Sequence, residues 1–259
     1  MNKTLWIAAT GMTAQQLKTD TIANNIANAS TTGYKKSVAN FKDLLYETQK
    51  EPGASTNAGS DLPVGIQIGS GVDIGATSKF FGQGSALDSS SDLDLMIKGE
   101  GFFQVALPDG TNALTRDGNL YMNQNGQVVT SAGYEIVGFP NLDPQGLNIT
   151  IAEDGTVSQN VNGEINEVGR IQIARVANPE GLSSVGGNIY METEASGQAQ
   201  LGSPGENGYG GIAQHALEGS NVDIVKEMVD LIAAQRAYEL NSKTIKSADE
   251  MLQQISNLK

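Results

Sequence analysis

Apolar residues recur with a helical period at both ends of the chain. The seam positions step by alternating threes and fours over residues 5–29 and again over residues 224–252, with polar residues at some of them, such as Gln15, Thr19 and Gln235. Such steps place side chains along one stripe of a helix, which is the seam that coiled-coil helices share. Ser220 and Asn221 precede the second run, and both residue types are favoured at helix N-termini. The pattern predicts two terminal helices that pair through their seams.

The two helices carry more apolar surface than one helix pair can bury. Further apolar residues flank the seams, including Trp6 and Ile7 at one end and Val225, Val229 and Ile232 at the other. Burial of a large apolar side chain contributes roughly 1.5–3 kcal/mol, whereas ordering a backbone residue costs roughly 1–2 kcal/mol. A lone pair that buries one seam is therefore marginal, and the remaining faces are expected to contact other subunits. Core-facing helices of an ordinary domain are the alternative interpretation.

Between the helices, short alternating or apolar runs are separated by turns such as PDG, EDG and NQNG. Glycine and asparagine accept the positive φ that hairpin turns require. The pattern therefore predicts an antiparallel β domain of barrel or sandwich type. The predicted strands are residues 92–98, 102–107, 119–123, 127–130, 134–139, 147–151, 170–176 and 188–193.

The resulting fold class is α+β, with terminal α-helices pairing as a coiled-coil inner domain, an extended arm, and a central all-β antiparallel domain. A stretch rich in Gly, Ser, Asn and Pro follows the first helix, and its alternating Val64, Ile66 and Ile68 favour an extended, partly ordered arm. The expected boundaries are 1–46 for the N-terminal helical half, 47–75 for the arm, 76–219 for the β domain with a return linker at 194–212, and 220–259 for the C-terminal helical half.

Composition excludes several functional classes. The formal net charge is −13, and residues 46–220 hold 6 basic against 21 acidic side chains, so the basic groove that nucleic acid requires is not expected. Without cysteine there is no disulfide, zinc–thiolate site or cysteine nucleophile, and the single histidine, His215, is expected to be satisfied or exposed. No run approaches the roughly 20 apolar residues of a membrane span, so no membrane insertion is expected.

Motifs with catalytic or cofactor chemistry are weak. The Gly69-Ser70-Gly71 stretch lacks the third glycine of a dinucleotide fingerprint. Asp92 and Asp94 have no second carboxylate cluster nearby, and solvated aspartates at a strand edge are the expected interpretation. No catalytic residue, cofactor or metal site is therefore predicted. An exported enzyme or glycan-binding module built on the β domain is a second, less favoured hypothesis.

Three segments resemble the N-terminal, central and C-terminal motifs of the flagellar rod and hook axial proteins. They are ANNIANASTTGYK at residues 23–35, SDLDLMIKGEGFF at 91–103 and SNVDIVKEMVDLIAAQRAYELNSKTIKSADEM at 220–251. They occur in the family's order in a chain of suitable length. Within the family, the arm and the segments after it are similar to distal-rod subunits, with a proximal-rod or hook-type subunit as the alternative.

The resemblance implies an assembly. Terminal helices would pack as an inner layer around an export channel, and the β domain would face outward in a rigid helical tube that transmits torque from motor to hook. It also implies passage through the flagellar type III export apparatus without a cleaved signal peptide, and a place in the periplasm-spanning rod of the basal body. The expected partners are further copies of the chain, proximal rod proteins, the hook protein, the L and P ring proteins and the rod cap protein.

Specific residues are expected at the subunit interfaces. On the first helix and the turn after it they are Leu5, Ala8, Met12, Ile22, Asn24, Asn25, Ile26, Asn28, Gly33 and Tyr34. On the second helix they are Ile224, Met228, Leu231, Gln235, Arg236, Tyr238, Ile245 and Leu252. The residues expected to make the arm rigid are Pro52, Leu62, Pro63, Ile66 and Ile68.

Local roles are also expected for some of these residues. The asparagines would cap the end of the first helix and bond neighbouring chains, and Gly33 would adopt positive φ. Arg236 would pair with a carboxylate of an adjacent subunit or, alternatively, with Glu239 one helical turn away.

Overall fold

The computed structural model describes residues 2–51, 64–161 and 164–257, and the chain divides into two compact units. The helical unit comprises Met1–Ile26, Ser37–Ser78 and Ile224–Lys259. The β unit comprises Ala27–Lys36 and Lys79–Asp223. Each unit thus draws on segments that are far apart in the sequence.

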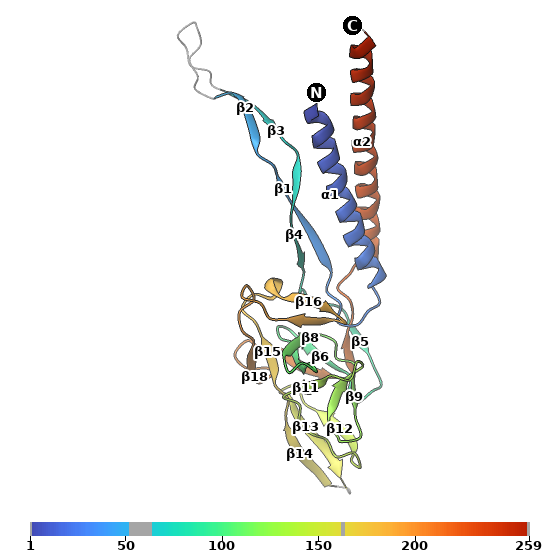
Figure 1. Ribbon diagram of the computed structural model, residues 1–259. Coiled ribbons are helices and arrows are strands. Elements are labelled where there is room, and N and C mark those ends of the chain that lie inside the picture. Colours follow the sequence, from blue (N-terminus) through green and yellow to red (C-terminus); the bar gives the residue numbers. More distant parts are fainter. Residues whose placement is uncertain (1, 52–63, 162–163, 258–259) are drawn as a thin grey trace. The chain divides into compact units, whose positions relative to one another are not determined.

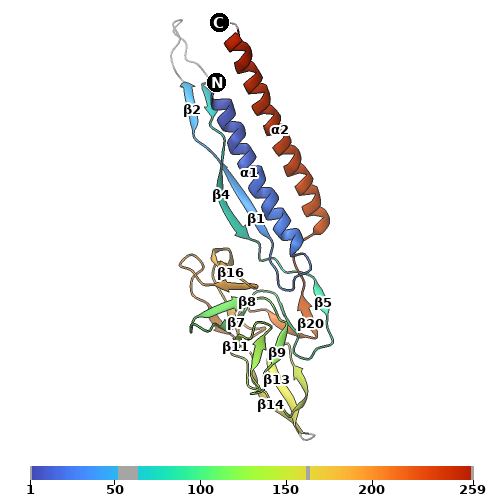
Figure 2. The same ribbon diagram turned by 45° about the vertical axis from the view of Figure 1, so that its right-hand side comes forward.

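Two long helices dominate the helical unit and confirm the predicted terminal helices. They are α1 (Asn2–Ala27) and α2 (Ile224–Asn257), which run antiparallel beside each other (Figures 1 and 2). They meet at Gly11, where an added Cβ would lie 2.8 Å from Nδ2 of Asn241. A glycine at this position lets the two helices approach closely.

The buried stripe of α2 matches the predicted seam only in part. Glu227, Ala234 and Ala248 are buried, one residue before the predicted Met228, Gln235 and Asp249. Leu231, Ile245 and Leu252, which also belong to the predicted seam, are half-buried. On α1 the buried side chains are Ala8, Ala14, Ile22 and Asn25. The contacts between the helices therefore include small and polar residues, namely Gly11 with Asn241 and Asn25 with Glu227.

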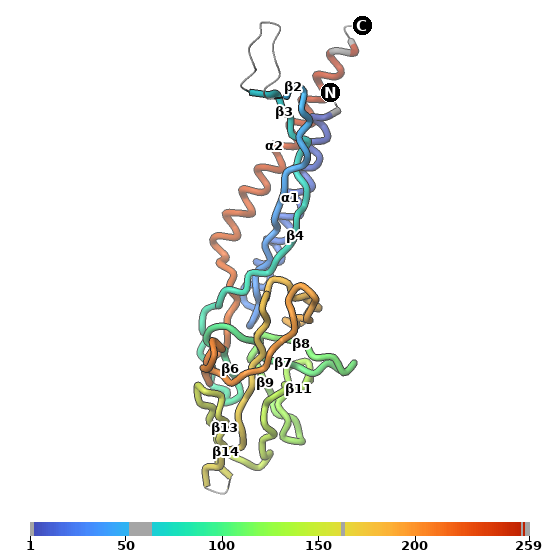
Figure 3. The backbone as a smooth tube through the Cα atoms, turned by 90° about the vertical axis from the view of Figure 1, so that its left-hand side faces the viewer, coloured from blue at the N-terminus to red at the C-terminus, as the bar shows by residue number. Residues whose placement is uncertain are grey.

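The rest of the helical unit is an arm of paired strands beside α1 (Figure 3). Strand β1 (Ser37–Asp43) pairs with β4 (Val72–Lys79), and β2 (Tyr46–Lys50) pairs antiparallel with β3 (Ile66–Gly69). Lys3 on α1 forms an ion pair with Glu47 at 2.6 Å and donates to the carbonyl of Ile68 at 3.3 Å. Among the described residues of the expected helical half, 1–46, α1 is the only helix, and Ser37–Asp43 forms a strand.

The largest sheet of the β unit has seven strands in the order β16-β17-β8-β7-β11-β10-β9, and neighbouring strands pair antiparallel. Its strands are β7 (Phe103–Ala106), β8 (Asn112–Thr115), β9 (Leu120–Met122), β10 (Val128–Thr130), β11 (Glu135–Val137), β16 (Ser183–Gly186) and β17 (Ile189–Met191). This arrangement confirms the antiparallel β region between the helices.

Smaller ladders complete the unit. They are β12 (Leu147–Ile151) with β13 (Thr156–Val161) and β14 (Glu164–Arg170), β15 (Ile173–Arg175) with β18 (Gln200–Gly202), β6 (Leu95–Lys98) with β19 (Gly211–Gln214), and β5 (Ala86–Asp88) with β20 (Ala216–Glu218). A short 3-10 helix, η1, spans Pro179–Gly181. Each of the eight predicted runs contains a strand, and the segment expected as a return linker holds β18 and the start of β19.

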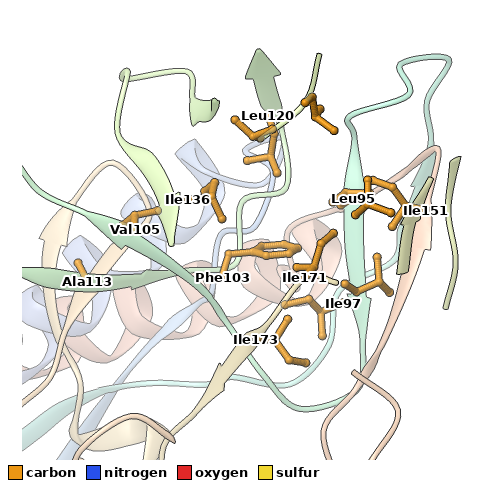
Figure 4. Close-up of a cluster of buried hydrophobic side chains, with 14 of the residues drawn as sticks. Leu95, Ile97, Phe103, Val105, Ala113, Leu120, Ile136, Ile151, Ile171 and Ile173 are labelled. Atoms are coloured by element: carbon orange, nitrogen blue, oxygen red, sulfur yellow. The ribbon is translucent and has the colours of Figure 1, made fainter. Parts of the chain in front are cut away.

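The hydrophobic core lies within the β unit. Phe103 and Val105 of β7 are fully buried and pack with Leu95, Ile97 and Ile173 from other ladders (Figure 4). Strands that bury alternate side chains against a shared core gain most of their stability from that burial. The β unit therefore has a complete core of its own.

Candidate assembly surface

The first half of α2 presents an apolar face to solvent. We define the outer stripe of α2 as Val225, Met228, Val229, Ile232 and Leu240, all of which are more than half exposed. Val225 is 72% exposed and Leu240 is 63% exposed. Contiguous exposed apolar residues of this kind mark interaction surfaces on soluble proteins.

The outer stripe lies opposite the stripe that faces α1. With 3.6 residues per turn, Ile232 and the buried Ala234 project from opposite sides of α2. One face of the helix is thus buried among the described residues, and the opposite face, which is more apolar, is exposed. Beyond Leu240 the same face becomes polar, with Lys243, Ser247 and Glu250.

A hollow of about 420 Å³ lies along the helix pair. Its lining consists of Gln16 and Thr19 of α1 and of Gln235, Tyr238 and Glu239 of α2. Gln235 and Tyr238 belong to the predicted seam, so these seam positions border open space in the single chain. Because Gln16, Gln235 and Tyr238 are exposed, this hollow is a groove on the surface of the helix pair that is open to solvent.

The predicted interface residues fall into three classes of exposure. Ala8, Ile22, Asn25, Gly33 and Tyr34 are buried within the chain. Leu5, Met12, Ile26, Asn28, Leu231, Ile245 and Leu252 are half-buried. Asn24, Ile224, Met228, Gln235, Arg236 and Tyr238 are exposed, as are Ile66 and Ile68 of the arm. Pro52, Leu62 and Pro63 lie outside the described residues.

Asn25 forms hydrogen bonds within its own chain. Its side-chain oxygen accepts a hydrogen bond from the backbone N–H of Ser37, and its Nδ2 donates to the Ser37 carbonyl, both at 2.9 Å. Nδ2 also donates to Oε2 of Glu227 at 3.2 Å. The Asn25 amide therefore bonds both backbone groups of Ser37, as a neighbouring strand would. Together with its bond to Glu227, it fixes the start of β1 against the end of α1 and the first turn of α2.

The turn after α1 has the geometry expected of it. The positive φ predicted for Gly33 is confirmed at +67°. Its N–H donates to the Glu218 carbonyl at 2.7 Å, and an added Cβ would lie 2.7 Å from the backbone N of Asp117. Both the dihedral angle and the close backbone therefore require glycine at this position.

The structure bears on the expectations for three polar residues, His215, Asp92 and Asp94. His215 is half-exposed and its Nδ1 lies 3.1 Å from the Ser91 carbonyl, which confirms the expectation of a satisfied or exposed histidine. The expectation for Asp94 is wrong. Asp94 is buried and accepts a hydrogen bond from the Ser89 hydroxyl at 2.5 Å, because the chain turns before β6 instead of continuing as a strand. Asp92 is exposed as expected.

Sequence reasoning missed a buried group of charges in the β unit. Lys35 is 0% exposed and Glu218 1%, and their side chains form an ion pair at 2.5 Å. Arg116, 5% exposed, lies 3.3 Å from the same carboxylate. Burial lowers the pKa of both Lys35 and Arg116, and contact with Glu218 opposes that effect. No local pattern signals these residues, because each gains its partner from a distant part of the chain.

Known proteins resemble this chain over its full length. A protein of Borreliella burgdorferi named "Flagellar basal-body rod protein FlgG" is 46% identical over 265 residues, covering 100% of this chain and 99% of that protein. Proteins of the same name from Caulobacter vibrioides and Buchnera aphidicola subsp. Schizaphis graminum are 45% and 44% identical, with 97% and 100% of both chains covered. This chain belongs to the flagellar basal-body rod protein family.

Three family descriptions match successive parts of this rod protein. "Flagella basal body rod protein" matches residues 5–35, "Flagellar hook protein FlgE/F/G D1 domain" matches 96–159, and "Flagellar basal body rod FlgEFG protein C-terminal" matches 213–258. The chain is a structural rod subunit of the flagellar basal body, and it assembles with other basal-body components. Within the described residues, neither helix has the length and apolar character to cross a bilayer, and no cluster of three potential metal ligands occurs.

Proposed function

We propose that this rod protein is a subunit of the distal rod, where copies polymerise into a rigid helical tube that encloses the export channel and transmits torque from motor to hook. The outer stripe of α2 is the observation that carries this proposal. Exposed apolar side chains along half of a long helix lose their contact with water when a second copy covers them. The resemblance of the arm region to distal-rod subunits and the FlgG name of the full-length relatives support the distal position.

The two faces of α2 support an open, head-to-tail assembly. A helical tube requires that one surface of a subunit fit a different surface of the next. We propose that the outer stripe of one copy packs into the hollow beside Gln16 and Tyr238 of the next. Exposed predicted residues such as Met228, Gln235 and Tyr238 would then contact the neighbour directly, whereas buried ones such as Ile22 and Tyr34 would act by shaping their own chain.

The arm is the proposed source of rigidity. Ile66 and Ile68 are exposed on a strand that Lys3 connects to α1. In a polymer, these side chains would fill space between neighbouring subunits and oppose bending. Pro52, Leu62 and Pro63 belong to the same proposal on sequence grounds. Deletion of the arm should leave a polymer that bends, and straight rods from such a variant would contradict the assignment.

The remaining partners follow from a distal position. The acidic β unit would face the surrounding L and P ring proteins, and the ends of the polymer would contact proximal rod proteins and the hook protein. The rod cap protein and the type III export apparatus would act during assembly. Electron cryo-microscopy of basal bodies that contain this subunit tests the position, because a proximal-rod or hook-type subunit would lie at a different level relative to the rings.

Substitution of Val229 by Asp tests the assembly surface. A charge in the middle of the outer stripe should abolish polymerisation and motility, because a buried unpaired carboxylate is costly. The monomer should keep its helix content, because Val229 is exposed in the single chain. Ser247→Asp is the matched control, because it introduces the same charge on the same face beyond the apolar half. Motile cells with normal rods carrying Val229→Asp would overturn the proposal.

A further inference from the structure

The β unit continues into the helical unit at four places, and three of the segments concerned meet at one polar cluster that is largely buried. They are residues 33–36, 80–84 and 218–221, which adjoin the boundaries between the units at Lys36, Lys79 and Asp223. We define the junction cluster as Lys35, Arg116, Glu218 and Asn221. All four residues lie in the β unit, and the cluster therefore gathers the ends of three chain connections.

The carboxylate of Glu218 joins all three segments. Its Oε1 accepts hydrogen bonds from Nζ of Lys35 at 2.5 Å and from the backbone N–H of Gly84 at 2.9 Å. Its Oε2 accepts from Nη1 of Arg116 at 3.3 Å. Hydrogen bonds to charged groups are roughly twice as strong as neutral ones. The single side chain of Glu218 thus links residues 33–36, 80–84 and 218–221.

The neutral amide of Asn221 links the same three segments as Glu218. Its Oδ1 accepts from the backbone N–H of Lys36 at 2.8 Å. Its Nδ2 donates to the carbonyls of Phe80 at 2.7 Å and of Gly82 at 2.9 Å. Two side chains from the last segment therefore bind the same pair of other segments independently.

Arg116 connects the cluster to the core of the β unit. Its Nη2 donates to the Gly99 carbonyl at 2.8 Å, directly after β6, and its guanidinium lies 5.2 Å from the ring centroid of Phe102. The Nε of Arg116 is buried without a hydrogen-bond partner among the described residues. An unsatisfied buried donor is unfavourable, so greater stability alone does not account for this arrangement.

We propose that the junction cluster is a mechanical lock that makes the three connections move as one body with the β unit, so that torque passes through the subunit without flexing of its connecting segments. This inference rests on the proposed torque-transmitting function. Buried ion pairs often add little net stability compared with apolar packing, and in some proteins they select one arrangement over its competitors, which is the role proposed here. Each of the three family matches supplies one charge of the cluster, namely Lys35, Arg116 and Glu218.

Hydrogen exchange of the full-length chain tests the lock. In Glu218→Gln, the amides of residues 33–36, 80–85 and 218–221 should exchange about a hundredfold faster, because removal of one partner leaves the other buried charges uncompensated. Exchange in β7 should stay unchanged. Glu206→Gln is the control, because it removes a carboxylate from an exposed ion pair with Arg170 in the same unit. The proposal would be overturned if exchange became faster throughout the β unit, or if exchange in the three segments stayed at the parent rate.

Asn221→Ala provides a second variant that leaves the charges in place. It should speed exchange in residues 36, 80–82 and 221, and it serves as the decisive variant if Glu218→Gln does not fold. In cells that assemble rods from either variant, rotation should slow under high viscous load and match the parent without load. Equal rotation at high load would refute the lock. Normal rods in a strain that lacks the subunit would instead refute the proposed function.

Discussion

The two units handle their large apolar side chains in opposite ways. In the β unit, Phe103, Val105 and Ile173 are fully buried, and the strands around them enclose a closed core. In the helical unit, the helices meet at Gly11 and Asn241, while Val225 and Leu240 remain exposed. One unit is complete as a single chain, and the other exposes the surface on which we propose that further copies pack. The same hydrophobic effect serves folding in one unit and assembly in the other.

Leu120→Ala should give the largest effect on the monomer. Leu120 is buried in the β core, and removal of its side chain should lower the free energy of unfolding by about 2–5 kcal/mol. Urea unfolding of the full-length chain measures the change. An effect as small as that of an exposed leucine would show that the β core is not the main source of stability.

Gly33→Ala should destabilise the β unit by about 1–3 kcal/mol. The new Cβ would require a strained positive φ and would meet the backbone of Asp117. Gly110→Ala serves as the control, because Gly110 also has positive φ but has open space around it. Urea midpoints of both variants separate the cost of the dihedral angle from that of the close contact. Equal midpoints would contradict the role assigned to close packing at Gly33.

Leu240→Ala should leave the monomer almost unchanged while weakening the polymer. An exposed side chain contributes little to folding, so the free energy of unfolding should change by no more than about 0.5 kcal/mol. The critical concentration for polymerisation, followed by light scattering, should rise. Together with Leu120→Ala, the same chemical deletion then separates the folding core from the assembly surface. Loss of monomer stability in Leu240→Ala would break that distinction.

Asp117→Asn should produce the smallest change, and one that depends on pH. Burial raises the pKa of Asp117, although bonds from Asn119 and Thr32 oppose the shift. The folded chain therefore binds more protons than the unfolded chain between pH 3.8 and the raised pKa, so stability falls as pH rises through that window. The variant should match the parent at low pH and lack this fall. Urea unfolding of both proteins at several pH values measures the difference. If the free energy of unfolding falls equally with pH in parent and variant, Asp117 is not the cause of the fall.

Periodicity in the sequence predicted both helices and eight strands, because large apolar residues mark surfaces that leave water. The predicted seam of α2 is only partly buried, because Leu231, Ile245 and Leu252 are half-buried whereas Met228 and Gln235 are exposed. The contact with α1 also includes Asn241, which carries little hydrophobic signal. The periodicity missed eight of the strands described in the β unit, among them β8, which is short, and β14, which is largely exposed. Periodicity could not predict the junction cluster, because Lys35 and Glu218 are 183 residues apart and become a buried pair only in the folded chain.

The bond between Asn25 and Glu227 has a consequence for the order of folding. These residues are separated by 202 positions, whereas Lys3 and Glu47 are separated by 44. The entropic cost of loop closure grows with loop length, and contacts between distant residues form slowly. Docking of α2 also becomes easier once the β unit has folded and brought the two ends of the chain near each other. We therefore expect the helix that carries the outer stripe to take its place last, after the rest of the subunit has formed.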